Sequence, residues 1–108
     1  MSRGADILPL ASQDIVEIAA FIAGDSPRSA ARFVDAVRAT VEFLSAAPKA
    51  GRSRTDLSAA FPRSLRSFRV WRFPNYVIFY LSSRRGITVV RVLHGSQSVE
   101  DEIESPSP

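Results

Sequence analysis

The chain has 108 residues, of which 45% are hydrophobic, and this predicts one small domain, residues 1–108, with enough apolar material for a single core. It contains no cysteine, which excludes disulfide frameworks and thiolate metal sites. No apolar run approaches the ~20 residues that cross a bilayer, and residues 1–6 lack the pattern of a signal peptide. We therefore expect a cytoplasmic protein without a membrane segment, and we expect neither a cofactor nor a metal ion.

The formal net charge of +3 conceals an uneven distribution of charge. Residues 49–91 contain ten basic residues and one acidic residue, whereas both flanking segments have an excess of acids. Nine of the ten bases are arginine. The planar guanidinium binds carboxylate and phosphate groups, whereas lysine and histidine transfer protons more readily. The middle of the chain is therefore expected to bind an acidic surface, on nucleic acid, on a protein partner or on the chain's own ends.

The N-terminal part of the chain is predicted to form a short strand and then a helix. Residues 7–10 favour a strand, which Pro9 restricts to a sheet edge or a strand end because proline donates no backbone hydrogen bond. Residues 12–23 have helical periodicity, with Ser12 as the N-cap and Gly24 after the last turn. The apolar stripe of this helix consists of Ile15, Ile18, Ala19 and Ile22.

A second helix is predicted to begin at Ser26 and Pro27, because serine caps helix starts and proline fits the first helical position. Pro48 ends it. Its apolar stripe consists of Ala30, Phe33, Val34, Val37, Val41 and Leu44. The opposite face carries charges at spacings that allow mutual pairing, namely Arg32, Asp35, Arg38 and Glu42. Two amphipathic helices joined at residues 24–25 predict an antiparallel hairpin that covers one common surface.

A connector over residues 48–63, rich in proline, glycine, serine and arginine, precedes three β-like runs. The runs are residues 66–73, 76–81 and 87–94. Pro74 and Asn75 predict the first turn, and residues 82–86 predict the second. The middle run is apolar or aromatic at every position, which is typical of a central strand that is buried on both faces.

The fold class that follows is α+β. A helix hairpin packs on an antiparallel sheet of three or four strands, the meander being joined by the short N-terminal strand. A helical turn is expected from Ser98, where three acids lie near its N-terminus. Residues 104–108 are expected to be a disordered tail.

Four side chains allow both a structural and a functional interpretation. His94 is the only side chain whose ordinary pKa of ~6.5 suits proton transfer near neutral pH, but a single histidine at a strand end is more often structural. Trp71, Tyr76 and Tyr80 could stack on nucleic-acid bases, although aromatic residues in strands more often belong to the core or to cross-strand pairs.

The arginines of the meander also leave two interpretations open. Arg66, Arg69, Arg72 and Arg91 alternate with apolar residues on adjacent predicted strands. They form either a solvated face or one arginine-lined sheet surface for an acidic partner.

The order of these elements, with several short segments, resembles the RelE/ParE superfamily of bacterial type II toxins. The segments are Pro-Lys-Ala-Gly-Arg (48–52), Leu-Arg (65–66), Phe-Pro-Asn-Tyr-Val-Ile-Phe-Tyr (73–80) and Arg-Val-Leu-His-Gly (91–95). The resemblance spans about residues 7–103 and is closer to the ParE branch. It implies a RelE/ParE-like fold and a toxin that is neutralised by a cognate ParD-like antitoxin, in a hetero-oligomeric complex.

Within this superfamily, characterised ParE proteins inhibit DNA gyrase, whereas RelE proteins cut mRNA in the ribosomal A site. RelE-like nucleases use clustered lysine and arginine with a tyrosine or histidine near the C-terminus. Here Lys49 is the only lysine, and no lysine, arginine or tyrosine follows Arg91. The resemblance therefore favours a gyrase-binding inhibitor. The alternatives are a ribosome-dependent mRNA endonuclease and a degenerate member that binds an antitoxin without being toxic.

The resemblance and the charge pattern together assign candidate sites. The predicted antitoxin-binding residues are Phe21, Arg66, Arg69, Trp71 and Arg91. Phe21 belongs to this set because, with Val16 and Ala23, it lies outside the apolar stripe of the first helix. The predicted target-binding residues are Arg72, Arg84, Arg85 and His94. A binding inhibitor needs no catalytic residue; in the endonuclease alternative, the catalytic residues are His94, Arg91 and Arg69.

Overall fold

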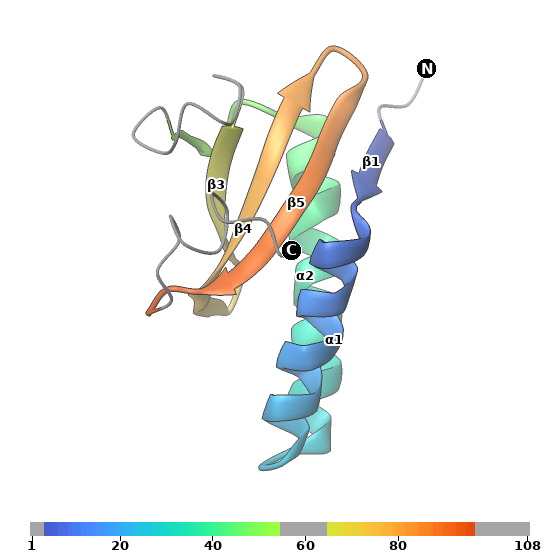
Figure 1. Ribbon diagram of the computed structural model, residues 1–108, viewed down its shortest axis with the longest axis vertical. Coiled ribbons are helices and arrows are strands. Elements are labelled where there is room, and N and C mark those ends of the chain that lie inside the picture. The colour runs from blue at the N-terminus through green and yellow to red at the C-terminus, as the bar shows by residue number, and fades with distance from the viewer. Residues whose placement is uncertain (1–3, 55–64, 97–108) are drawn as a thin grey trace, which may run out of the picture.

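A helix hairpin packs on one face of a five-stranded sheet in the computed structural model, which describes residues 4–54 and 65–96 (Figure 1). The strands are β1 (Gly4–Ile7), β2 (Arg52–Ser53), β3 (Leu65–Val70), β4 (Phe73–Ser83) and β5 (Gly86–His94). The helices are α1 (Pro9–Ala23) and α2 (Pro27–Ala46). This arrangement confirms the α+β class and the helix hairpin. The helical turn expected from Ser98 and the tail over residues 104–108 lie outside the described residues.

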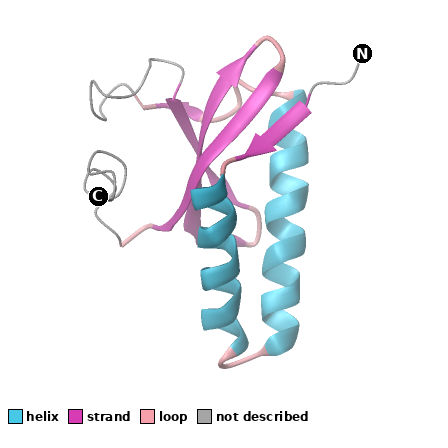
Figure 2. Cartoon of the chain, turned by 45° about the vertical axis from the view of Figure 1, so that its right-hand side comes forward, coloured by secondary structure: helices cyan, strands magenta, loops and turns pink. Residues whose placement is uncertain are grey.

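The sheet has the order β1-β5-β4-β3-β2, so β4 is the central strand, as predicted (Figure 1), and the two helices run side by side (Figure 2). β3, β4 and β5 form the expected antiparallel meander. The expectation of a purely antiparallel sheet of three or four strands is wrong, because β1 pairs in parallel with β5, from Gly4 opposite Gly86 to Ile7 opposite Val89. The connector adds β2 at the other edge.

The N-terminal strand lies earlier than the sequence predicts, and α1 begins earlier too. Pro9 occupies the first turn of α1 rather than the end of a strand. This position suits proline, because the first helical N–H groups have no acceptor within the helix. Leu8 precedes the helix without a side-chain cap, and its carbonyl accepts the Ser12 N–H at 3.0 Å, so Ser12 is not the N-cap.

The second helix agrees with its prediction. Ser26 caps α2 by accepting a hydrogen bond from the Ser29 N–H at 3.1 Å, Pro27 follows it, and the helix ends two residues before Pro48. Its buried face comprises Ala30, Phe33, Ala36, Val37, Thr40, Val41 and Leu44. The predicted stripe is therefore confirmed, with Val34 at its partly buried margin.

The first hairpin turns at Trp71 and Arg72, not at the predicted Pro74 and Asn75, which lie inside β4. Arg72 adopts the left-handed conformation, with a φ of 68°. The pairing jumps from Arg69 opposite Val77 to Val70 opposite Phe73, so Pro74 lies in a bulge where the β3–β4 ladder needs no N–H from it.

Both faces of the central strand are buried, as its uninterrupted apolar run predicts. Ile78 and Tyr80 join the core beneath the helices. Phe79 points to the opposite face, where it packs with Leu65 and Leu93. This alternation is the normal period of two along a strand.

The connector is fixed to the sheet through Tyr80. The Tyr80 hydroxyl donates a hydrogen bond to the Pro48 carbonyl at 2.8 Å and accepts one from the Gly51 N–H at 2.9 Å. Burial raises the pKa of Tyr80 above its ordinary value of 10.0, opposed by the Gly51 hydrogen bond and the positive charge of Arg66. Arg66 adds a bond to the Gly51 carbonyl at 2.7 Å. Residues 48–51 are therefore held against β3 and β4.

We expect Gly51→Ala to lower the free energy of unfolding by about 2 kcal/mol, because overpacking at a buried site is destabilising. A Cβ there would overlap the Tyr80 hydroxyl and lie 2.9 Å from the Ser67 carbonyl oxygen. Urea denaturation measures the change. Gly4→Ala is the control, because a Cβ at Gly4 meets no atom within 4 Å. Equal unfolding midpoints for the two variants would contradict the proposed packing.

Candidate functional site

Arg91 forms a largely buried ion pair with Asp14, which joins β5 to α1. Its Nε donates to Asp14 Oδ2 at 2.7 Å, and its Nη2 donates to Asp14 Oδ1 at 2.9 Å. The two side chains are 15% and 10% exposed. A bidentate pair between a guanidinium and a carboxylate is among the strongest polar contacts in proteins. The guanidinium of Arg91 is therefore engaged by an acid of its own chain.

The same carboxylate also closes the edge of β5. β1 covers this edge as far as Val89, whose carbonyl accepts the Leu8 N–H at 3.0 Å, and the chain then turns into α1. Beyond that point Asp14 Oδ2 accepts the backbone N–H of Val92 at 3.0 Å. Asp14 thus takes the place of a neighbouring strand for this donor, which a buried position would otherwise leave unsatisfied.

Asp14 was not singled out from the sequence, although a signal for it exists. It follows Ala11 by three positions and precedes Ile18 by four, so it lies on the apolar side of α1. An acid at such a position needs a buried partner. The partner could not be named from the pattern, because Arg91 is 77 residues away along the chain.

A groove of about 410 Å³ lies beside this ion pair, between α1 and the end of β5. Its walls include Glu17 and Phe21 from α1, Tyr76 from β4 and His94 from β5. Phe21 is 78% exposed, in agreement with its position outside the apolar stripe. We call this space the α1–β5 groove.

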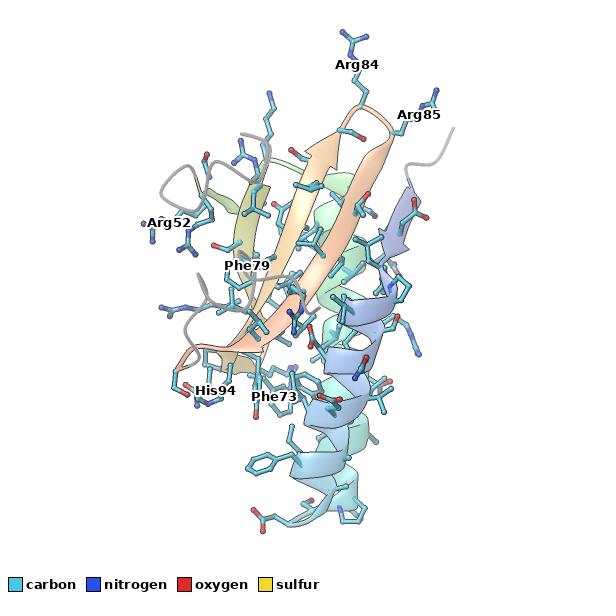
Figure 3. All side chains as sticks on the ribbon, in the orientation of Figure 1. Arg52, Phe73, Phe79, Arg84, Arg85 and His94 are labelled. Atoms are coloured by element: carbon cyan, nitrogen blue, oxygen red, sulfur yellow. The ribbon has the colours of Figure 1, made fainter. Side chains whose placement is uncertain are left out.

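His94 lies at the end of β5 (Figure 3), where it lines the α1–β5 groove and contacts two neighbours. Its Nδ1 accepts the Ser96 N–H at 3.0 Å and lies 2.6 Å from the Ser96 hydroxyl oxygen. The Tyr76 ring packs edge-on against the imidazole, with 5.1 Å between ring centroids. An Nδ1 that accepts a backbone hydrogen bond leaves the proton of the neutral ring on Nε2.

The three residues proposed for an endonuclease are not brought together. His94 lies at the end of β5, and the guanidinium of Arg91 is paired with Asp14. Arg69 is on β3, which β4 separates from β5. Within residues 4–54 and 65–96, no cluster of histidine, aspartate and glutamate side chains could hold a metal ion.

The arginines of the meander do not line one surface of the sheet. The hypothesis of a single arginine-lined sheet surface for an acidic partner is therefore wrong. Arg66 pairs with Tyr80 in register, on the face of the sheet that the helices cover. Arg69 is an odd number of positions further along the strand, so it points to the other face, where it is exposed. Arg91 points to α1.

The predicted target-binding residues divide between the two ends of the meander. Arg84 and Arg85 form the tip of the β4–β5 hairpin, whereas His94 lies at the opposite end, beside the β3–β4 turn that contains Arg72 (Figure 3). These four residues therefore cannot contact one small target surface together.

A second exposed apolar surface lies at the outer edge of β3. Trp71 is 40% exposed and packs on Phe43, with 5.1 Å between ring centroids, and Phe43 also contacts Phe68. β2 pairs only with Arg66 and Ser67, so no described strand covers residues 68–70 on that side. We call this surface, with Arg69, the aromatic edge. Phe43 was not anticipated, although it lies outside the apolar stripe of α2.

A comparison of the sequence with models of protein families identifies the family of the chain. A family model described as the ParE toxin of type II toxin–antitoxin systems, parDE, matches residues 6–99. The chain belongs to the ParE toxin family. The resemblance to the RelE/ParE superfamily is thereby confirmed, and the family identifies the protein as a toxin with an antitoxin partner. No curated protein matches the chain.

In this ParE-family chain, neither described helix is long and apolar enough to cross a membrane. The match begins within β1 and continues past β5, so all of the described elements except the first two residues of β1 fall inside it.

We expect Asp14→Asn to destabilise the toxin by about 3 kcal/mol, because removing one partner of a buried ion pair leaves an uncompensated buried charge. Chemical denaturation monitored by circular dichroism measures the loss. Asp35→Asn is the matched control: its contact with Arg38 is 3.8 Å long and both side chains are more than 70% exposed. Exposed pairs contribute at most about 1 kcal/mol. A loss of the same size in both variants would refute the structural role of Asp14.

Proposed function

We propose that this toxin inhibits DNA gyrase by binding it, and that a ParD-like antitoxin holds it inactive. The observation that carries the proposal is the match to the ParE toxin family over nearly the whole chain. The commitment of Arg91 to Asp14 supports binding rather than catalysis.

RNA cleavage through a 2′-hydroxyl needs a base, an acid and a cation for the phosphorane charge, all within reach of one phosphate. His94 borders the α1–β5 groove, and its Nδ1 is hydrogen-bonded to Ser96. Lys49 lies with Arg84 beside a groove at the opposite end of the meander. The separation of these groups supports a protein-binding inhibitor.

The antitoxin is proposed to cover the exposed apolar side chains of α1. Phe21, Val16 and Leu10 are each at least half exposed. Phe21 and Leu10 lie on one side of α1, about three turns apart, whereas Val16 lies on another side, so a partner that runs along the first side covers two of these three side chains. An amphipathic helix that fills the α1–β5 groove would bury Phe21, and helix-in-groove binding is a common mode of peptide recognition.

The same antitoxin segment can continue to the aromatic edge. Phe21 lies on the α1–β5 groove with His94, and the β3–β4 turn containing Trp71 lies at the same end of the meander. An extended stretch could add to β3 beyond Ser67, with acidic side chains paired to Arg69. Arg66 and Arg91 are less suited to this role, because carbonyl oxygens and Asp14 respectively already engage them.

This placement also gives neutralisation a physical cause. Arg72 and His94 lie at the end of the meander where the antitoxin is proposed to bind. If gyrase contacts the toxin through these residues, the antitoxin excludes gyrase by occupying the same surface. Neutralisation is then direct competition and needs no change in the shape of the toxin.

We expect the purified toxin to inhibit DNA supercoiling by gyrase, and we expect the cognate antitoxin to restore supercoiling. His94→Ala should leave ribosome-dependent mRNA cleavage unchanged, because none is expected from the wild type. A toxin that left supercoiling intact and cut mRNA on ribosomes, with the cut lost in a folded His94→Ala variant, would replace this proposal with the endonuclease.

We expect Phe21→Ala to weaken antitoxin binding by about 2 kcal/mol at any salt concentration, as truncation of a buried aromatic anchor does. Arg69→Glu should weaken it by more than the ~0.2 to 1 kcal/mol of a surface ion pair, because repulsion is added to the lost contact, and this loss should shrink at high salt. Calorimetric titration at low and high salt measures both. Arg38→Glu, on the exposed face of α2, is the control for charge reversal. Unchanged affinity in both test variants would move the antitoxin to another surface.

A further inference from the structure

The β4–β5 hairpin tip and the connector beside it form an end of the molecule with an excess of positive charge, although the neighbouring strand β1 contributes one acid, Asp6, opposite Thr88. We call this surface the basic end and define it by Lys49, Arg84 and Arg85, all exposed. Among the described residues 47–54 and 65–91 there is no acidic side chain. The field of this end is therefore positive, and the antitoxin surfaces proposed above lie at the other end.

A groove of about 660 Å³ separates the hairpin tip from the end of α2. Lys49 borders it on the connector side, and Arg84 borders it on the hairpin side together with the hydroxyl-bearing Ser82 and Ser83. Its remaining walls are alanine and proline side chains, with no large apolar residue.

The backbone that carries these cations is held in place. The Ser83 hydroxyl accepts the Arg85 N–H at 3.2 Å, and the Arg85 carbonyl accepts the Gly4 N–H at 3.1 Å. On the connector, Arg66 bonds to the Lys49 and Gly51 carbonyls at 3.3 and 2.7 Å. The backbones are therefore fixed, while the side chains of Arg84 and Arg85 project away from the body (Figure 3).

We propose that the basic end binds the phosphate backbone of duplex DNA. Arginine, lysine and serine side chains are the groups that contact phosphates, and such contacts need no anchor residue and no fixed sequence. A protein partner would instead be expected to place a large side chain in a well-packed pocket, and the alanine and proline walls of this groove offer little for one to pack on. The proposal of phosphate binding follows from these observations alone. The choice of DNA as the phosphate-bearing partner rests on the proposed function, because gyrase binds duplex DNA.

Fluorescence anisotropy of a labelled duplex of arbitrary sequence, titrated with the full-length toxin alone, tests the proposal. Phosphate contacts through Lys49, Arg84 and Arg85 predict that affinity falls about 40-fold between about 50 and about 200 mM salt. The double variant Arg84→Gln/Arg85→Gln keeps only the Lys49 contact, so its affinity for the duplex should fall only about fourfold over the same salt range. Arg32→Gln/Arg38→Gln removes the same charge from the exposed face of α2 and should bind as the wild type does.

Four outcomes would overturn the proposal. The first two are no binding of the DNA duplex at about 50 mM salt and an equal loss of duplex affinity in the two double variants. The other two are tighter binding of an RNA duplex of the same sequence, and binding of a poly-glutamate peptide in preference to the DNA duplex. Gyrase supercoiling is measured separately with the same proteins. Inhibition of supercoiling without duplex binding rejects the basic-end proposal and leaves gyrase inhibition standing. Duplex binding without inhibition of supercoiling supports the basic-end proposal and rejects gyrase inhibition.

Discussion

The carboxylate of Asp14 is the contact on which the arrangement of helix and sheet depends. It binds the Arg91 guanidinium through both oxygens and accepts the Val92 N–H, so one side chain of α1 completes the edge of β5 where β1 ends. A short parallel edge strand can therefore pass directly into a helix without leaving a buried donor unpaired. Such a contact also fixes geometry, because a bidentate pair tolerates little rotation of α1 on the sheet.

A helix held in this way can keep large apolar side chains in solvent. Phe21 is one turn beyond Glu17 on α1, at the border of the α1–β5 groove, and the helix does not need that ring for its own packing. The aromatic edge lies at the same end of the meander, while the basic end lies at the other. The toxin thus offers two chemically distinct surfaces, one rich in exposed apolar side chains and one cationic, at opposite ends of the meander.

The parts of the fold that the sequence predicts are those set by local chemistry. The start of α2 follows from Ser26 and Pro27, and the central position of β4 follows from its apolar run. Pro9 was misinterpreted because a strand end and a first helical turn both tolerate proline. The hairpin turn was misplaced because the bulge around Pro74 depends on pairing with β3. In the site, the exposure of Phe21 was foreseeable from the helix alone, whereas the role of Asp14 depends on a strand 77 residues away.

Amide hydrogen exchange of the toxin, alone and bound to its antitoxin, tests most directly whether the α1–β5 junction is fixed and the β3 edge is the docking surface. We expect the Val92 amide to be as strongly protected as the amides of the β4–β5 ladder in both states, since Asp14 accepts its hydrogen bond. The Arg69 amide, which strand alternation directs away from β4, should gain protection only in the complex. Rapid exchange of Val92 in the free toxin, with no change at Arg69 on binding, would show that Asp14 does not fix the α1–β5 junction and that the antitoxin does not dock on β3.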